Sequence, residues 1–243
     1  MDLKWIPASL RSTIHDVLDS CLGAAPRKYY EWVARETLDL VERNPTRTIV
    51  ELGAGTAPIA RALAGTLEGR KNISLRVSDL YPDKALYQTL EKMYPGLVQV
   101  DLNPVDFSLP MDFLSGSLLV LSAAFHHLPP AARVDALKVL SVYRVAVFEP
   151  LRRSPASFFL SLFGFVPALR TPILFWNRRP GNFRRILWCW LVPLATVIIC
   201  WDGLVSCLRC WTDKEWKDQL APVIGKDRLV FTKSEIFSQM IVW

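Results

Sequence analysis

The sequence predicts an α/β protein whose mostly parallel sheet carries helices on both faces, with a hydrophobic helical insertion after the fifth strand. Between residues 46 and 150, short β-branched or apolar runs alternate with amphipathic runs, as in successive strand–helix units. The first strand, 48–52, leads into a glycine turn. From residue 151 to 211 long apolar runs replace the alternation. The 243 residues suit one α/β domain with an insertion.

Local periodicity and boundary residues place the first elements of the chain. An amphipathic helix is predicted over 9–22, with Ser9 as its cap, because its apolar residues recur at helical spacing. A second helix is predicted over 27–43, where Asn44-Pro45 ends it. The alternating region then contains strand 48–52, helix 58–67, strand 73–78, helix 82–94, strand 97–100, strand 118–122, helix 129–140 and strand 144–148.

The end of the chain returns to regular structure after the insertion. The capping box Thr-Asp-Lys-Glu at 212–215 predicts a helix that continues to about Leu220. Two short apolar runs, 228–232 and 238–243, predict a pair of antiparallel strands.

The segment after the first strand, Glu51-Leu-Gly-Ala-Gly55, has the composition of a ligand-binding turn. Gly53 and Gly55 carry no side chain, so the chain can turn sharply and a ligand can approach the backbone amides. Pro58 then suits the first turn of a helix. A nicotinamide-binding domain is the structural competitor, but it expects Gly-x-Gly-x-x-Gly, and this turn continues with Thr-Ala-Pro.

Acidic residues follow the next two strands. Asp79 lies 24 positions after Gly55 at the carboxyl end of the second strand, where doubly wound folds hold ribose hydroxyl groups. Asp101 follows the third strand and is expected beside the adenine position.

These motifs resemble class I S-adenosylmethionine-dependent methyltransferases over roughly residues 27–150. Glu51-x-Gly53-x-Gly55 matches the first motif of that family, with Ala57 where many members have another glycine. The resemblance implies a seven-stranded Rossmann-like sheet and S-adenosyl-L-methionine as cofactor. The residues that it implies for cofactor binding are Glu51, Gly53, Ala54, Gly55, Asp79, Leu80, Asp101, Leu102 and Ser122.

Candidate catalytic residues follow strands four and five. His126 and His127 lie in Ser122-Ala-Ala-Phe-His-His-Leu-Pro129, which resembles the family segment near the transferred methyl group. An imidazole can accept a proton from a hydroxyl nucleophile, although one of two adjacent histidines usually only packs. Glu149 is the other candidate, with an alternative role of anchoring Arg152 or Arg153. An acceptor that is already nucleophilic needs no base.

No metal site is predicted. Cys207 and Cys210 form a single Cys-x-x-Cys without a second pair or a nearby histidine at metal spacing. Small buried thiols in a reducing compartment are the better interpretation. Residues 1–23 lack the continuous apolar core of a signal peptide, so the expected location is cytoplasmic, with peripheral or monotopic membrane association.

The insertion accounts for the basic character of the chain. Seven Arg and no Lys, Asp or Glu lie between residues 150 and 201, whereas the whole chain has a net charge of +6. The apolar runs 157–169 and 186–201 are shorter than the about 20 residues of a bilayer span, and Pro167 and Pro193 interrupt them. Four tryptophans resemble an interfacial belt: Trp176, Trp188, Trp190 and Trp201. Asp202-Gly203 is predicted to begin a turn, with a wall of the substrate pocket as the alternative.

Four regions are therefore expected: a helical cover (1–45), a cofactor-binding core (46–150), a hydrophobic Arg/Trp-rich insertion (151–211) and a terminal helix with two strands (212–243). The preferred function is methyl transfer to a small apolar acceptor, with membrane contact through 157–201. A soluble lid with inward-packed tryptophans is the alternative for the insertion.

The alternative functions are a protein or nucleic-acid methyltransferase and a catalytically silent binding module. Nucleic acid is disfavoured because Ser-Ala-Ala-Phe replaces the usual Asn/Asp-Pro-Pro-Tyr/Phe motif. The oligomeric state is left open.

Overall fold

The computed structural model describes residues 6–21, 25–68, 72–111, 116–176, 181–225, 231–234 and 238–243. The chain divides into two compact units. The sheet unit consists of Tyr30–Arg152 and Trp211–Trp243, and the helical unit consists of Met1–Tyr29 and Arg153–Cys210. The expected N-terminal cover is thus shared between the units, with its first 29 residues in the helical unit.

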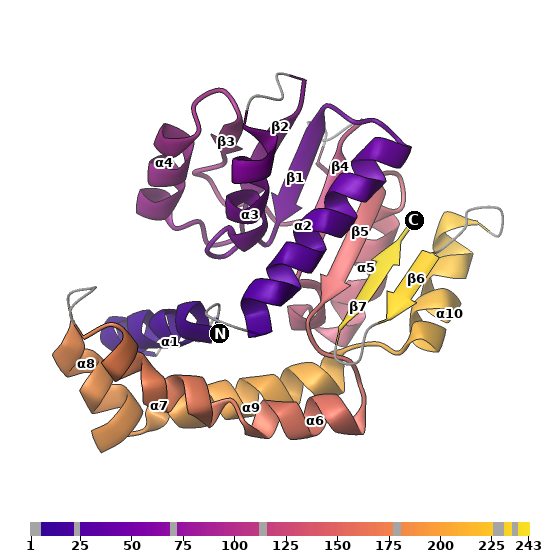
Figure 1. Cartoon of the computed structure of the whole chain (residues 1–243). Helices are drawn as coiled ribbons and strands as arrows, with labels where there is room; N and C mark the ends of the chain where they lie inside the picture. Colours follow the sequence, from indigo (N-terminus) through magenta and orange to yellow (C-terminus); the bar gives the residue numbers. More distant parts are fainter. Residues whose placement is uncertain are drawn as a thin grey trace. The chain divides into compact units, whose positions relative to one another are not determined.

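The sheet unit contains a seven-stranded, mostly parallel sheet (Figure 1). Its order is β3-β2-β1-β4-β5-β7-β6, in which β7 is antiparallel to both β5 and β6. The predicted α/β architecture is therefore confirmed. The strands are β1 (Thr48–Leu52), β2 (Ser74–Ser78), β3 (Val98–Val100), β4 (Leu118–Ser122), β5 (Arg144–Glu149), β6 (Phe231–Ser234) and β7 (Gln239–Val242).

Helices cover both faces of this sheet, because each buried strand has apolar side chains on both sides. Val50 and Leu52 of β1 belong to a core cluster that also contains side chains of α5 and α10. On the opposite face, Trp32 of α2 packs edge-on against Phe148 of β5 at a centroid distance of 5.4 Å. Figure 1 shows α2 in front of the strands and α5 behind them. The helices are α2 (Ala25–Arg43), α3 (Pro58–Leu67), α4 (Lys84–Met93), α5 (Pro130–Leu140) and α10 (Asp213–Ile224).

The terminal elements follow the prediction with shifted boundaries. The capping box is present, with Thr212 and Glu215 bonded to each other's backbone amides. The helix continues past Leu220 to Ile224. The penultimate strand is described over Phe231–Ser234, and residues 228–230 of the predicted strand lie outside the described residues.

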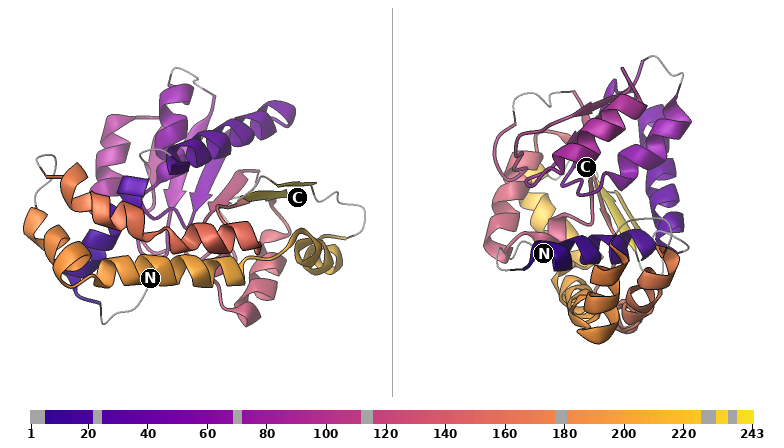
Figure 2. Two further views of the ribbon diagram at one scale, coloured as in Figure 1. Left: turned by 60° about the horizontal axis from the view of Figure 1, so that its bottom comes forward. Right: turned by 90° about the vertical axis from the view of Figure 1, so that its left-hand side faces the viewer.

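The helical unit contains α1 (Ala8–Cys21), α6 (Pro155–Leu162), α7 (Phe165–Leu174), α8 (Asn182–Ile186), the π-helical turn η3 (Leu187–Leu191) and α9 (Leu194–Arg209). Within it, α6 and α7 follow one another along α9, as Figure 2 shows. Ser9 lies inside α1 rather than capping it, and its hydroxyl group accepts a hydrogen bond from Trp188.

Of the two helix breaks that the sequence places at Pro167 and Pro193, one lies elsewhere and the other is found at the expected proline. The first break lies at Phe163–Gly164 rather than at Pro167, because a proline in the first turn of α7 is compatible with a helix. Residues Pro155–Leu174 then form a 20-residue stretch of mean hydropathy 1.5, long and apolar enough to cross a membrane. The second break does include Pro193, and Asn182–Leu191 and Leu194–Arg209 meet at 67°.

The predicted turn at Asp202-Gly203 is wrong, since both residues lie inside α9. Gly203 permits close packing between helices there. A Cβ atom at this position would lie 3.2 Å from the Cβ atom of Ser161 on α6. The glycine signals contact between two helices rather than a change of chain direction.

Replacing Gly203 with Val is therefore expected to destabilise the helical unit by about 1–3 kcal/mol, because the new side chain forces α6 and α9 apart. Gly65→Val is the matched control, since Gly65 is also helical and a Cβ atom there meets nothing within 4 Å. Its free energy of unfolding should change by less than about 0.5 kcal/mol. Denaturant titration of both variants checks this, and equal losses of stability would contradict the packing argument.

Candidate cofactor and active site

The glycine turn after β1 lies at the carboxyl edge of the sheet and has the backbone conformation that glycine favours. Gly53 and Gly55 have φ angles of +63° and +53°. A Cβ atom on Gly53 would lie 2.8 Å from the Cβ atom of Ala124, in the segment that follows β4. A Cβ atom on Gly55 would meet nothing within 4 Å. The first glycine thus allows two loops to touch, and the second leaves open space beside the backbone. Ala57 has a φ angle of 52°, which explains why glycine suits that position.

The Glu51 carboxyl group is buried beneath the first turn of α3. Its two oxygens accept hydrogen bonds from the amide of Ile59 (3.1 Å) and the amide of Ala60 (2.7 Å). The carboxyl oxygens thus pair two backbone amides that a helix N-terminus otherwise leaves without an acceptor. Burial nevertheless dominates and raises the pKa of Glu51 to about 8, against the effect of the two amides. A cation arriving beside this group would favour its ionised form.

The Asp79 carboxylate joins β2 to the glycine turn. One oxygen accepts a hydrogen bond from the amide of Gly55 (2.8 Å), and the other accepts one from the amide of Tyr81 (2.7 Å). Asp79 is partly exposed, so its remaining lone pairs can accept bonds from a ligand. The structure therefore brings together the two acids and two glycines that the sequence indicates.

The Asp101 side chain is engaged by its neighbours on β2. Arg76 donates two hydrogen bonds to it, at 2.6 and 2.8 Å, and Ser78 donates another. Burial opposes ionisation, but these bonds outweigh it and hold the pKa of Asp101 below its ordinary value. The carboxylate thus joins β3 to β2, which leaves the neighbouring backbone as the more accessible candidate for contact with adenine.

The other residues predicted to bind cofactor occupy the same edge of the sheet. Ala54 is buried, and its amide donates to the carbonyl oxygen of Ser78 (3.2 Å). Leu80 is 41 % exposed after β2, and Leu102 is partly exposed after β3. Ser122 ends β4 and is partly exposed. Because the parallel strands β1 to β4 end at this edge, these residues lie along the same edge of the sheet as the glycine turn.

His126 and Glu149 form a buried dyad in the same unit. The Glu149 carboxylate contacts Nδ1 of His126 at 2.6 Å and accepts a hydrogen bond from the His126 backbone amide at 3.2 Å. Their side chains are only 5 % and 1 % exposed. If Nδ1 carries the proton, Nε2 of the neutral ring is an acceptor. Glu149 thus orients His126, as the carboxylate of a catalytic triad orients its histidine.

His127 differs from its neighbour in exposure. It is exposed to solvent, and its ring stacks obliquely on that of His126 at a centroid distance of 4.3 Å. The buried Arg133 donates hydrogen bonds to the carbonyl oxygens of His126 (2.9 Å) and Leu128 (3.0 Å), which fixes the loop after β4. His126 is therefore the histidine whose position is tightly determined.

Two features of the site were not predicted from the sequence. Phe107, in the loop after β3, lies 3.5 Å from the position that a Cβ atom of Gly53 would occupy. Ala123, directly after β4, has a φ angle of 54°, which is strained for a residue with a side chain. An aromatic residue in a long loop and an alanine after a strand carry no distinctive local signal.

A separate hollow of about 560 Å³ lies near the amino ends of β1, β4 and β5, and Thr46, Ser117 and Arg144 contribute to its lining. The Arg144 guanidinium group donates to the carbonyl oxygens of Leu40 and Asn44, near the end of α2. This arrangement supports the helix end and provides no acid or base for chemistry.

Comparisons with solved structures identify the fold. PigF with SAH matches 96 % of this chain at a TM-score of 0.53 and 14 % identity. The CMeT domain of the citrinin polyketide synthase matches 88 % at 0.55 and 14 % identity, and a putative O-methyltransferase from Nostoc punctiforme matches 89 % at 0.51 and 11 % identity. This chain covers 65 %, 51 % and 56 % of those three chains, respectively. No protein-family model and no curated protein sequence matches it. The chain has the fold of class I S-adenosylmethionine-dependent methyltransferases.

The raised pKa of Glu51 predicts a specific pH dependence of stability. Between pH 4.5 and about 8 the folded protein keeps a proton on Glu51 that the unfolded chain releases. The free energy of unfolding should therefore fall as pH rises through this window, by at most about 1.4 kcal/mol per pH unit from this group. Glu51→Gln removes the titration, so the variant should lose less stability. Denaturant titrations from pH 5 to 8 test this, and parallel pH profiles for both proteins would contradict it.

Proposed function

We propose that this chain is a methyltransferase that transfers a methyl group from S-adenosylmethionine to a small hydrophobic acceptor. The observation that carries the proposal is the arrangement at the carboxyl edge of β1 and β2. There the buried Glu51, the open glycine turn and Asp79 are joined by hydrogen bonds to backbone amides. The likeness to PigF, whose structure contains SAH, supports the same choice of cofactor.

The residues at this edge match the chemical groups of the cofactor. Glu51 would receive its ammonium group, and the exposed backbone at Gly55 would lie beside its amino-acid portion. Asp79 would accept hydrogen bonds from the ribose hydroxyl groups. Leu80 and Leu102 would border the adenine ring, and the open space at Gly55 accommodates a ligand. When bound, the cofactor supplies an electrophilic methyl group on a positively charged sulfur.

The His126–Glu149 dyad would remove a proton from an acceptor hydroxyl group. Glu149 holds the ring through Nδ1, so the lone pair on Nε2 is available to accept that proton. The resulting imidazolium would be stabilised by the adjacent carboxylate, which lies 2.6 Å from Nδ1. An acceptor that is nucleophilic without deprotonation would bypass this step.

The preference for an apolar acceptor rests on the exposed Phe, Leu and Trp side chains of the helical unit in the same polypeptide. A protein or nucleic-acid acceptor is the second candidate within this chemistry. A binding module without activity is the third. The binding module differs from the two enzymes in that it need not bind the cofactor. The two enzymes differ in whether the methyl group is found on small apolar molecules or on macromolecules.

Asp79→Ala should abolish binding of labelled S-adenosylmethionine, because both the ribose acceptor and the bond to the Gly55 amide are lost. Asp135→Ala is the control, since this exposed aspartate on α5 pairs only with Lys138 among the contacts that the structure records for it. It should bind as the unaltered protein does. Equilibrium dialysis measures both affinities. If the unaltered protein does not bind the cofactor, the silent-module proposal replaces the enzyme.

The acceptor class can be found with methyl-labelled cofactor, purified protein and an extract of its source cells. The products are partitioned among organic, aqueous and macromolecular fractions. Label in the organic fraction is expected for an apolar acceptor. Label confined to aqueous or macromolecular material would overturn that choice without affecting the methyltransferase proposal.

His126→Gln should lower the rate of methyl transfer by about 10²–10⁴, while the affinity for cofactor changes little. His127→Gln is the matched control and should retain the original rate, because this histidine is exposed and it is His126 whose Nδ1 contacts Glu149. Single-turnover measurements over a range of pH separate a change in the rate of methyl transfer from a change in cofactor affinity. Equal rates for His126→Gln and the unaltered protein would show that no base is supplied here.

A further inference from the structure

We propose that the helical unit embeds its outer surface in a lipid bilayer that contains anionic phospholipid. This inference is independent of the methyl-transfer proposal, because it rests on the composition of the helical unit alone. Four observations support it: the exposed apolar surface, the paired polar groups buried inside, the close packing of helices through small residues, and the excess of arginine.

The outer surface of the helical unit is apolar over several helices. Large hydrophobic side chains at least 58 % exposed occur on α6, α7, η3 and α9 and in the connection between the first two, among them Phe159, Phe163, Ile173, Leu191, Val197 and Trp201. Water-soluble proteins rarely expose this many large apolar side chains on consecutive elements of one unit. A nonpolar environment is therefore the expected surrounding of these side chains.

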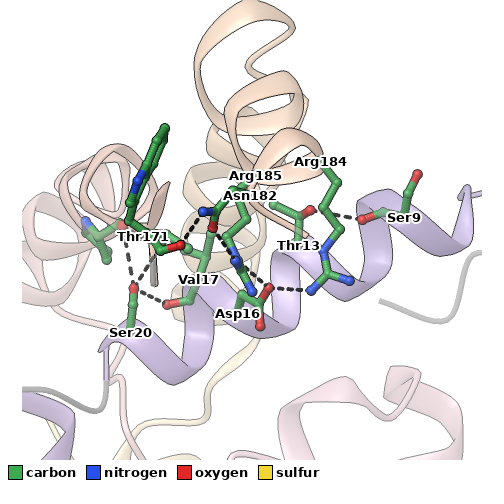
Figure 3. Close-up of polar contacts among 11 residues, drawn as sticks. Ser9, Thr13, Asp16, Val17, Ser20, Thr171, Asn182, Arg184 and Arg185 are labelled. Carbon is green, nitrogen blue, oxygen red and sulfur yellow. Dashed lines mark hydrogen bonds and ion pairs between the residues drawn. The ribbon is translucent and has the colours of Figure 1, made fainter. Parts of the chain in front are cut away.

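One cluster of charged groups, by contrast, is centred inside the helical unit. Asp16 of α1 is buried and binds both Arg185 (2.8 Å) and Arg184 (2.6 Å) of α8, as Figure 3 shows. Arg185 is completely buried and also donates to Asn182. Pairing removes most of the cost of burying these charges, which would be high for an isolated ion.

The same polar interior continues along α1. Ser20 shares a hydrogen bond of 2.8 Å with the buried Thr171 of α7. Thr13 is also buried, and its hydroxyl group donates to the carbonyl oxygen of Ser9. These paired polar groups lie beside a buried apolar cluster that includes Leu10, Ile14 and Ile199. The unit therefore has apolar side chains both inside and outside, and its buried polar groups are paired as they are in proteins surrounded by lipid.

The helices of this unit approach closely through small residues. Ser157 and Ser161 on α6 are buried, as is Ser206 on α9. Gly203 allows α9 to lie directly against Ser161, and a Cβ atom on Gly164 would meet Ile199 of α9 at 3.2 Å. Helices in lipid commonly associate in this way, because small side chains permit close contact and leave large ones for the acyl chains.

The charge of the insertion favours anionic lipid. Residues 150–201 contain seven Arg and no acidic residue, and three of these arginines, Arg152, Arg184 and Arg185, pair with Asp213 or Asp16 elsewhere in the chain. Arg170 is exposed on α7 in the middle of apolar side chains, where its long chain can reach a phosphate group. Trp176 and Trp190 are 52 % and 42 % exposed, and tryptophan favours the boundary between headgroups and acyl chains. Arginine together with tryptophan therefore matches an anionic membrane surface better than a neutral one.

Vesicle cosedimentation of the full chain tests the proposal. Preformed vesicles of phosphatidylcholine alone are compared with vesicles that also contain phosphatidylglycerol. The protein should sediment with the anionic vesicles, and added salt should weaken this binding. Protein that stays in the supernatant with anionic vesicles would overturn the proposal.

Variants identify the surface. Phe163→Glu combined with Leu191→Glu should reduce the affinity for anionic vesicles at least tenfold. The control combines Met93→Glu with Val142→Glu, which are 63 % and 74 % exposed in the sheet unit, and should leave binding within about twofold, as expected for sites away from the contact surface. Circular dichroism confirms that all variants are folded. Equal loss in both pairs would contradict the assignment of the surface.

Arg170→Gln tests the preference for anionic lipid. Removal of one arginine near the membrane surface is expected to weaken binding to anionic vesicles about fivefold and to leave binding to neutral vesicles unchanged. A second copy of the chain is the competing occupant. If the unaltered protein is a dimer, the variant with Phe163→Glu and Leu191→Glu is a monomer, and neither of them binds vesicles, then the surface is a protein interface and the proposal is wrong.

Discussion

Burial of the Glu51 carboxyl group at the start of α3 is the constraint on which the candidate site depends. A carboxyl group without water needs donors, and the amides of Ile59 and Ala60 supply them only if α3 begins directly after the glycine turn. The same turn brings the Gly55 amide to Asp79. One buried acid therefore fixes the path of the chain between the first strand and the first helix. Its raised pKa also means that a bound cation would change its ionisation.

The two units differ in where their polar groups lie. In the sheet unit, acids at the strand ends accept hydrogen bonds from backbone amides or from neighbouring side chains, and Asp79 remains partly exposed where a ligand can reach it. In the helical unit, Asp16 and Arg185 pair inside while the outer surface is apolar. This contrast is consistent with a site that binds a charged, water-soluble cofactor and a separate surface suited to lipid. An apolar acceptor drawn from a membrane would connect these properties within one chain.

The sequence predicts the sheet well, because buried parallel strands and glycine turns leave local signals. The strand–glycine–helix order, the acid at Asp79 and the capping box at Thr212 all depend on neighbouring residues. Features that depend on distant contacts are different. The pairing of Asp101 with Arg76 joins two strands, and the role of Gly203 depends on a helix some 40 positions away in the chain. Neither contact has a local pattern, so the sequence alone does not predict them, and Asp202-Gly203 reads as a turn although both residues lie inside α9.

The most direct test of the account is calorimetric titration of the unaltered protein with S-adenosylmethionine at pH 7, in buffers with different heats of ionisation. If the ammonium group of the cofactor meets Glu51, whose pKa is about 8, binding should release a proton and the measured heat should depend on the buffer. Glu51→Gln should remove that dependence. Binding with no dependence on buffer would contradict the role of Glu51, and the absence of binding would contradict the cofactor site itself.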